Sequence, residues 1–223
     1  VVFYCIMTLY SNIFAMFSAL VPHIKERLTK HHELYSGKCK DLYWEENCAH
    51  ALRKAGYGSD WYADENHKPG LDQTTDDGIR VGNKSGKILM KRVIDEKTGK
   101  KIKVMDSVGI NGSRLTKHKT LDDKLKFLGA KKEDYIFCLA TNEKDWKNGI
   151  RKYYFMVIDS EKLDYHNHIW EDMMGVKETT KGQHMGWKMT SENFDAKIVK
   201  RMSHQLWTSI KLDFCEEIHD IVI

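Results

Sequence analysis

The chain has 223 residues, of which 41% are hydrophobic and 30% charged, so it can bury a core and is not expected to be disordered. Only two prolines and fifteen glycines are present, which excludes a collagen-like or linker-dominated chain. The formal net charge of +4 permits a polyanionic partner without requiring one. The five cysteines are scattered, and none forms the C-x-x-C spacing of a zinc site or redox pair. We therefore expect reduced thiols and a cytoplasmic protein.

Residues 1–21 carry no charge, which raises the question of a membrane segment. Four polar residues interrupt the run: Thr8, Ser11, Asn12 and Ser18. Neither the basic start nor the cleavage site of a signal peptide is clear. We expect a packing helix here, with a membrane anchor as the weaker alternative, and a charged helix over residues 21–35. Met7 is a candidate start, in which case the first six residues would be an artefact of the reading frame.

Residues 41–55 have the pattern of an amphipathic helix closed by Gly56. At about 100° per residue, one face collects Leu42, Glu45, Cys48, Ala49, Leu52 and Ala55. Glu45 is the anomaly on this face, because a buried carboxylate is costly unless it is paired or ligating. A structural salt bridge and a role in a site are both open for it.

Short strands are expected over residues 60–63, 71–74 and 78–84. A hairpin is then predicted, with strands over residues 87–93 and 101–110 and its turn at 95–99.

Thr120 and Asp123 predict a capping box at the start of a helix that ends at Gly129. Leu121, Leu125 and Leu128 line one face of it. The continuous apolar runs 135–140 and 153–158 predict buried strands. Helical stretches are expected near 194–207. This order predicts an α/β fold with a central mixed sheet flanked by helices.

The densest candidate chemistry lies around Asp72 and Lys84. A carboxylate at the start of one strand and a lysine on the next can lie side by side across a hairpin. Such a pair suits metal-assisted phosphodiester hydrolysis, with the carboxylate on Mg²⁺ and the lysine at the water or the transition state. The alternative is a turn followed by a solvated lysine.

Residues 111–120 place basic and hydroxyl side chains between a strand and a helix N-terminus. Arginine and lysine pair with phosphate charge, and a helix start adds donors. The segment is a candidate for contacts with a phosphate backbone, and an exposed polar loop is the alternative.

Together these residues resemble the PD-(D/E)xK nuclease superfamily, and within it a type II restriction endonuclease. The resemblance rests on Trp44-Glu45, residues 69–72, residues 81–86 and the 112–114 segment before the 120–128 helix, and it spans roughly residues 36–158. It implies a restriction-endonuclease-like core.

By that resemblance, Asp72 would bind the metal, Lys84 would be the catalytic lysine, and Glu45 would support the metal site. DNA phosphates would be contacted by Ser113, Arg114, Lys117 and Lys119.

One position departs from the family pattern. The second acidic residue should lie two positions before the lysine, where this chain has Gly82. Asp76 and Asp77 are nearby, but they could not easily reach the site from a turn. Either Glu45 supplies the missing ligand, or the chain is a degenerate, inactive relative.

The C-terminal third is rich in tryptophan and histidine. It predicts either an aromatic core or a surface that faces DNA or a second copy, with Lys177, Lys181 and Lys188 placed to follow phosphates. The expected division is an N-terminal helical segment over 1–35, a nuclease-like core over 36–158 and an extension of the same domain over 159–223.

The function expected from the sequence is Mg²⁺-dependent, sequence-specific cleavage of double-stranded DNA by a homodimer without membrane attachment. Three alternatives stay open: a repair or recombination nuclease on the same core, a non-catalytic DNA-binding or structural protein, and a membrane-anchored protein.

Overall fold

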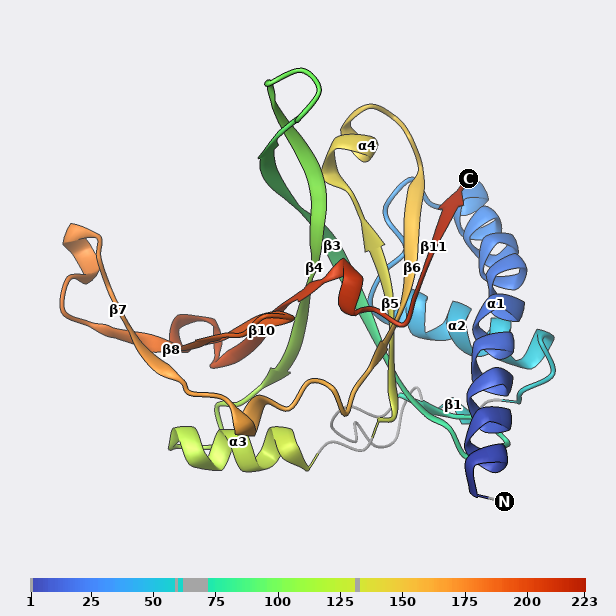
Figure 1. The fold of residues 1–223 in the computed structure, drawn as a ribbon, viewed down its shortest axis with the longest axis horizontal. Coiled ribbons are helices and arrows are strands. Elements are labelled where there is room, and N and C mark those ends of the chain that lie inside the picture. The colour runs from blue at the N-terminus through green and yellow to red at the C-terminus, as the bar shows by residue number, and fades with distance from the viewer. Residues whose placement is uncertain (1, 59, 62–71, 131–132) are drawn as a thin grey trace.

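The computed structural model describes residues 2–58, 60–61, 72–130 and 133–223, and it describes side chains from Ala15 onward, apart from those of Asp60 and Trp61. The protein belongs to the α/β class: a large mixed sheet carries helices on both faces (Figure 1). The predicted fold class is therefore confirmed at this level, while membership of the restriction-endonuclease core stays a prediction.

Eleven strands of the described chain form one sheet, in the order β11-β6-β5-β3-β4-β10-β9-β8-β7, with β1 and β2 attached to the side of β3. β3 and β5 run parallel, and the other pairs are antiparallel. In chain order the strands are β1 (Asp60–Trp61), β2 (Gln73–Thr74), β3 (Arg80–Ile94), β4 (Lys101–Arg114), β5 (Tyr135–Thr141), β6 (Lys152–Asp159), β7 (Glu171–Met174), β8 (His184–Thr190), β9 (Phe194–Val199), β10 (Gln205–Lys211) and β11 (Glu217–Val222).

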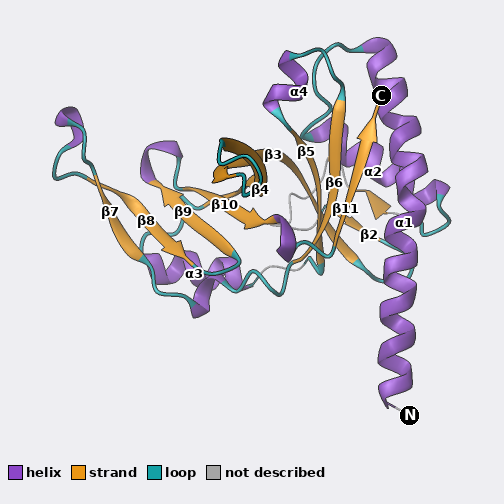
Figure 2. Ribbon diagram, turned by 45° about the horizontal axis from the view of Figure 1, so that its top comes forward, coloured by secondary structure: helices purple, strands orange, loops and turns teal. Residues whose placement is uncertain are grey.

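Two hydrophobic cores lie on opposite faces of this sheet. The first joins α1 (Val2–Leu34) and α2 (Leu42–Lys54) to β5, β6 and β11, and Figure 2 shows these two helices on one side of those strands. The second lies beneath α3 (Leu121–Gly129) and includes residues of β4, β9 and β10. A short helix, α4 (Glu143–Lys147), follows β5, and 3₁₀ turns occupy Tyr165–Asn167, Glu178–Thr180, Lys200–Met202 and Leu212–Phe214.

The N-terminal segment is one continuous helix, with Pro22 inside it. A row of buried side chains at helical spacing follows its inner face: Met16, Phe17, Leu20, Ile24 and Leu28. Phe17 meets Tyr135 and Phe137 of β5 edge-on, with ring centroids 5.3 and 5.6 Å apart. The expected packing helix is therefore present. Among the described residues, no helix is long and apolar enough to cross a bilayer.

Helix α2 agrees with its predicted limits, but its buried face is different. Leu42 is 56% exposed, so its placement on the inner face is wrong. Trp44 instead fills the core, and its indole N–H donates to the carbonyl oxygen of Phe137 at 3.1 Å. Leu42 is the first residue of the helix, and its side chain lies toward solvent. Trp44 anchors α2 directly to β5.

The hairpin is present, but its first strand is longer than predicted. The separate strands expected over 78–84 and 87–93 are one strand, β3, which continues through Gly86. A Cβ on Gly86 would lie 2.6 Å from the Cys138 sulfur and 2.8 Å from a methyl group of Val108. Glycine is therefore the residue that lets β4 and β5 flank β3 closely at this point.

Local signals in the middle of the chain are confirmed. Thr120 and Asp123 form the predicted capping box of α3, and Leu128 is buried on its inner face. The two apolar runs form β5 and β6, whose interior residues are almost all buried.

The helical prediction for 194–207 is wrong, because this region forms β9, a 3₁₀ turn and the first three residues of β10. Its residues alternate between buried and more exposed positions, which is the period of a strand and not of a helix. Residues beyond 159 form both ends of the sheet's strand order, since β11 lies at one end beside β6 and β7 lies at the other beside β8.

The described cysteines, Cys39, Cys48, Cys138 and Cys215, are free thiols, as expected.

Candidate functional site

The structure brings Asp72 and Lys84 together at the side of β3. Asp72 comes directly before β2, whose antiparallel register sets Gln73 opposite Val81. Its backbone N–H donates to the carbonyl oxygen of Val81 at 3.0 Å, which places the carboxylate beside the next two residues of β3. The neighbouring Pro69-Gly70-Leu71, on which the resemblance also rests, lies outside the described residues.

Three contacts fix this carboxylate and the ammonium. The backbone N–H of Asn83 donates to Asp72 Oδ2 at 2.5 Å. Lys84 Nζ lies 3.5 Å from the same oxygen and donates to the carbonyl oxygen of Asn83 at 2.8 Å. Both side chains are partly buried, with 20% of the Asp72 side chain and 24% of the Lys84 side chain exposed. The pair is therefore preorganised by backbone while still open to a ligand.

Helix α2 approaches the same place from the other side of β2. Gln73 Nε2 donates to the backbone carbonyl oxygen of Glu45 at 3.4 Å. The pKa of the Cys48 thiol is raised to about 12, mainly by burial. The hydrogen bond with Gln73 opposes this rise, and the negative charges of Asp72 and Glu45 add to it. Both carboxylates therefore act on one buried sulfur. The Glu45 residue itself is half-buried, between the inner face of α2 and solvent.

Asn83 is an unusual residue at this position. It is only 3% exposed, and neither Oδ1 nor Nδ2 of its side chain has a hydrogen-bond partner among the described residues. An unpaired buried amide costs about 1–3 kcal/mol, so such groups are rare in folded proteins and call for an explanation.

We expect the Asn83→Leu variant to unfold with a free energy about 1–3 kcal/mol higher than the wild type, because leucine keeps the branching and the number of non-hydrogen atoms of the side chain and removes the unpaired amide. Urea denaturation followed by tryptophan fluorescence measures the difference. The matched control is Asn193→Leu at an exposed position, which should change stability by about 0.5 kcal/mol or less. A less stable Asn83→Leu would show that the amide is satisfied in solution.

The other acidic residues considered for the site lie elsewhere. Asp76 and Asp77 are exposed in the turn between β2 and β3, where the N–H of Gly78 donates to the carbonyl oxygen of Thr75. Gly82 is buried within β3 and offers no ligand. In the described ranges, no three His, Cys, Asp or Glu side chains gather in a way that could hold a metal ion.

The predicted phosphate-contacting segment forms the end of β4 and the loop before α3. Arg114, Lys117 and Lys119 are exposed, and Ser113 is half-buried. The loop is tied to the β9–β10 connection, because Thr116 Oγ1 donates to the carbonyl oxygen of Ser203 at 2.8 Å. Pairing of β3 with β4 stops at Gly86 opposite Ile110, and Arg114 lies four residues further, or about 13 Å along the strand. The segment therefore lies beyond the last β3–β4 pair, at the end of β4 that is remote from the hairpin turn.

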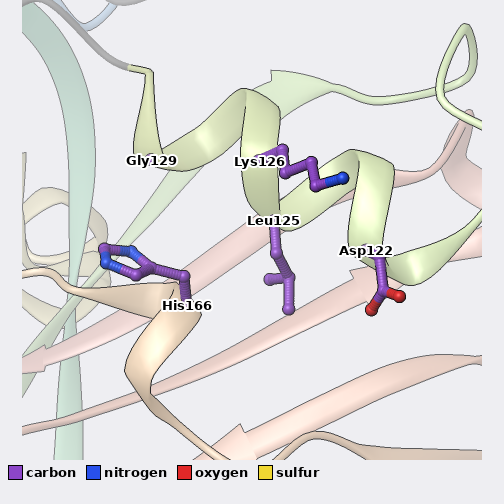
Figure 3. Close-up of a pocket in the computed structure, with 5 residues that line it drawn as sticks. All are labelled: Asp122, Leu125, Lys126, Gly129 and His166. Atoms are coloured by element: carbon purple, nitrogen blue, oxygen red, sulfur yellow. The ribbon is translucent and has the colours of Figure 1, made fainter.

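Two shallow hollows flank α3. One, of about 550 Å³, is lined by Lys117, His118, Lys119, Asp123, Lys126 and Phe127. The other, of about 350 Å³, lies between α3 and the turn that carries His166. Figure 3 shows that the His166 ring and the Asp122 carboxylate stand at opposite ends of this second hollow and do not point toward one another. This hollow therefore has no set of polar side chains that point toward one position.

Sequence reasoning missed Asn83, although it lies between the two residues at the metal-binding and lysine positions of the resemblance. No pattern in the chain marks a buried amide as unpaired, since that depends on what packs around it.

The chain matches no family model and no curated protein. What the site can do therefore has to be argued from its own geometry. A carboxylate and an ammonium are held at one strand edge, and the neighbouring Gln73 is bonded to the backbone carbonyl oxygen of Glu45 on α2.

Proposed function

We propose that the protein is a metal-dependent endonuclease that cleaves double-stranded DNA, of the restriction type. The observation that carries the proposal is the placement of Lys84 Nζ 3.5 Å from Asp72 Oδ2, with the backbone of Asn83 fixing both groups. A carboxylate for a divalent cation and an ammonium for the reacting phosphate are the two groups that this hydrolysis requires.

Asp72 and Glu45 would together hold a magnesium ion, with waters completing its coordination. Mg²⁺ is commonly held by one or two carboxylates and keeps several waters. Asp72 uses Oδ2 for its contacts with Asn83 and Lys84, so Oδ1 is available, and Glu45 would supply the second carboxylate in place of the residue that Gly82 lacks. When bound, the ion would supply Lewis acidity and lower the pKa of a water.

Each protein group then has a distinct task. Asp72 would hold the metal against the strand edge, at a position set by the Asn83 N–H. Lys84 would hold the attacking water, or stabilise the charge that grows on the phosphate oxygens, because its ammonium is already oriented by the Asn83 carbonyl. Arg114, Lys117 and Lys119, with Ser113, would bind phosphates further along the duplex. A two-fold homodimer would bring one such site to each strand of a palindromic sequence.

The proposal is tested by incubating the purified protein with supercoiled plasmid in Mg²⁺ or in EDTA. Cleavage in Mg²⁺ alone, giving discrete bands whose sequenced ends share one motif, is expected. A smear in Mg²⁺ would favour a repair or recombination nuclease that reads DNA shape. The Lys84→Ala variant is expected to lose at least about 100-fold in rate, since it removes a charged group from the transition state. Equally negligible cleavage by the wild type and by Lys84→Ala would instead favour a non-catalytic DNA-binding protein.

Lys25→Ala is the matched control for Lys84→Ala, because Lys25 is an exposed lysine of α1 that belongs to none of the proposed metal or DNA contacts. It should cleave at a rate within a few-fold of the wild type. A similar loss in both variants would mean that total charge, and not the position of Lys84, determines the rate.

A further inference from the structure

The β3–β4 hairpin projects beyond the rest of the sheet as a two-stranded arm, residues 88–106. Up to Lys87, β3 is also paired with β5, whose last residue, Thr141, lies opposite it. From Ile88 to Ile94 the pairing recorded for β3 is with β4 alone. Figure 1 shows the arm rising past the end of β5 beside α4. On the other edge, β10 reaches β4 only as far as Ser107. Within the described part of the chain, neither edge of the arm is therefore paired with another strand.

The arm is strongly basic. Six cationic side chains, all exposed, follow it: Lys91, Arg92, Lys97, Lys100, Lys101 and Lys103. Its three acidic residues are Asp95, Glu96 and Asp106. The Asp95 carboxylate is bound within the turn by Thr98 Oγ1 and the N–H of Lys97, and Asp106 is paired with Lys211 at 3.3 Å. The field around the arm is thus positive.

One cross-strand pair argues for a polyanionic partner. Arg92 and Lys103 are directly opposite each other in the register of β3 and β4, so their side chains leave the same face of the ribbon. Like charges in this arrangement destabilise a sheet. A bound polyanion would remove that cost.

A groove of about 630 Å³ separates the arm from α4, and it has lysines on both walls. Met90 and Lys103 line it from the arm, while Lys144 and Lys147 line it from α4. The acidic residue in its lining, Glu143, is paired with Lys38 at 2.7 Å and lies 3.9 Å from Lys87. The Asn142 amide contacts the Met90 sulfur at 3.6 Å, which ties the two walls together.

The arm lies at a distance from the candidate site that one DNA duplex could span. Lys84, Met90 and Arg92 all belong to β3, whose pairing with β4 shifts register between Leu89 and Met90. At about 3.3 Å per residue, Lys87 lies about 10 Å and Arg92 about 26 Å from Lys84. This span corresponds to roughly three to eight base pairs at about 3.4 Å each.

We propose that the arm and α4 together bind duplex DNA to one side of the scissile phosphate, with the two-stranded ribbon along a groove and the α4 lysines on the backbone. A two-stranded β-ribbon fits the major groove of B-DNA. The inference rests on the proposed function for its partner, and it adds a contact surface at the opposite end of β4 from the 113–119 segment.

The test measures binding of a fluorescein-labelled DNA duplex by anisotropy in EDTA, over a series of salt concentrations. The double variants Arg92→Ala/Lys103→Ala and Lys144→Ala/Lys147→Ala are each expected to weaken binding about tenfold and to lower the slope of log affinity against log salt by about 2, one unit per lost phosphate contact. Lys25→Ala/Lys54→Ala, two exposed lysines on α1 and α2, is the matched control and should bind as the wild type does. Melting temperatures of all variants exclude misfolding as the cause.

Unchanged binding in both double variants would overturn the inference, as would binding of anionic vesicles by the wild type without binding of duplex. The outcome is separable from that of the proposed function. Arm-dependent binding without cleavage by the wild type would leave the inference standing and refute the nuclease. Cleavage by the wild type, together with normal DNA binding by the arm variants, would support the nuclease and refute the role of the arm.

Discussion

The Trp44→Ala variant is expected to unfold with a free energy about 3–5 kcal/mol below that of the wild type. Trp44 is fully buried, its indole N–H donates to the Phe137 carbonyl oxygen at 3.1 Å, and its ring meets Phe155 edge-on at 6.0 Å. Its removal leaves a large cavity between α2 and the sheet, and losses of this size follow buried tryptophan and phenylalanine truncations. Urea denaturation followed by circular dichroism measures the change.

The preceding residue provides the matched control. Tyr43 is 50% exposed and contacts the rings of His31 and Tyr35 near the surface. Tyr43→Ala should therefore cost about 1 kcal/mol or less. If the two variants lost similar stability, Trp44 would not be the anchor of α2. Because Glu45 is the next residue along the helix, the Trp44 variant should also disturb the candidate site more than the Tyr43 variant does.

The parts of the fold that the sequence predicts are those whose signal is local. The capping box of α3 needs only Thr120 and Asp123, and both of its hydrogen bonds are present. The strands β5 and β6 were recognised as continuous apolar runs, because strands buried on both faces cannot alternate.

The parts that were mispredicted depend on contacts far along the chain. Strand β3 runs through Gly82, Asn83 and Gly86, residues of low strand propensity, because β5 pairs with it at all three positions and β4 joins its other edge from Gly86 onward. Strand β9 carried a readable period of two in Phe194, Ala196 and Ile198, all buried, and the helical prediction overlooked it. No local pattern predicts the burial of Trp44, because that burial depends on the sheet against which α2 packs.

Part of the candidate site can be predicted from the sequence. The short spacing between Asp72 and Lys84 allows them to meet across one antiparallel pairing, and they do so. The position of Glu45 relative to them depends on how α2 packs, which no local pattern specifies. The basic arm was predicted as a hairpin, but its projection beyond β5 follows from where β5 ends.

The Asp72→Asn variant is expected to lose Mg²⁺-dependent cleavage by at least about 100-fold while remaining folded. In the wild type, the backbone N–H of Asn83 donates to Asp72 Oδ2 at 2.5 Å. The asparagine keeps an oxygen that can accept this hydrogen bond, so the strand edge should be unchanged. What disappears is the negative charge that would hold the cation and balance Lys84 3.5 Å away. Loss of transition-state stabilisation of about 2.7 kcal/mol corresponds to that factor of 100. Plasmid cleavage rates over a Mg²⁺ series measure it.

The matched control is Asp77→Asn, five residues further along and exposed in the turn before β3. It removes the same charge from the same region, yet it should cleave within a few-fold of the wild type, because a turn carboxylate does not reach the strand edge. Equal losses in both variants would mean that local negative charge, and not ligation by Asp72, governs the rate. Retained activity in Asp72→Asn would refute its role as the metal ligand. Binding of duplex in EDTA should be as tight in Asp72→Asn as in the wild type or tighter, since removing a carboxylate beside the phosphate path relieves repulsion.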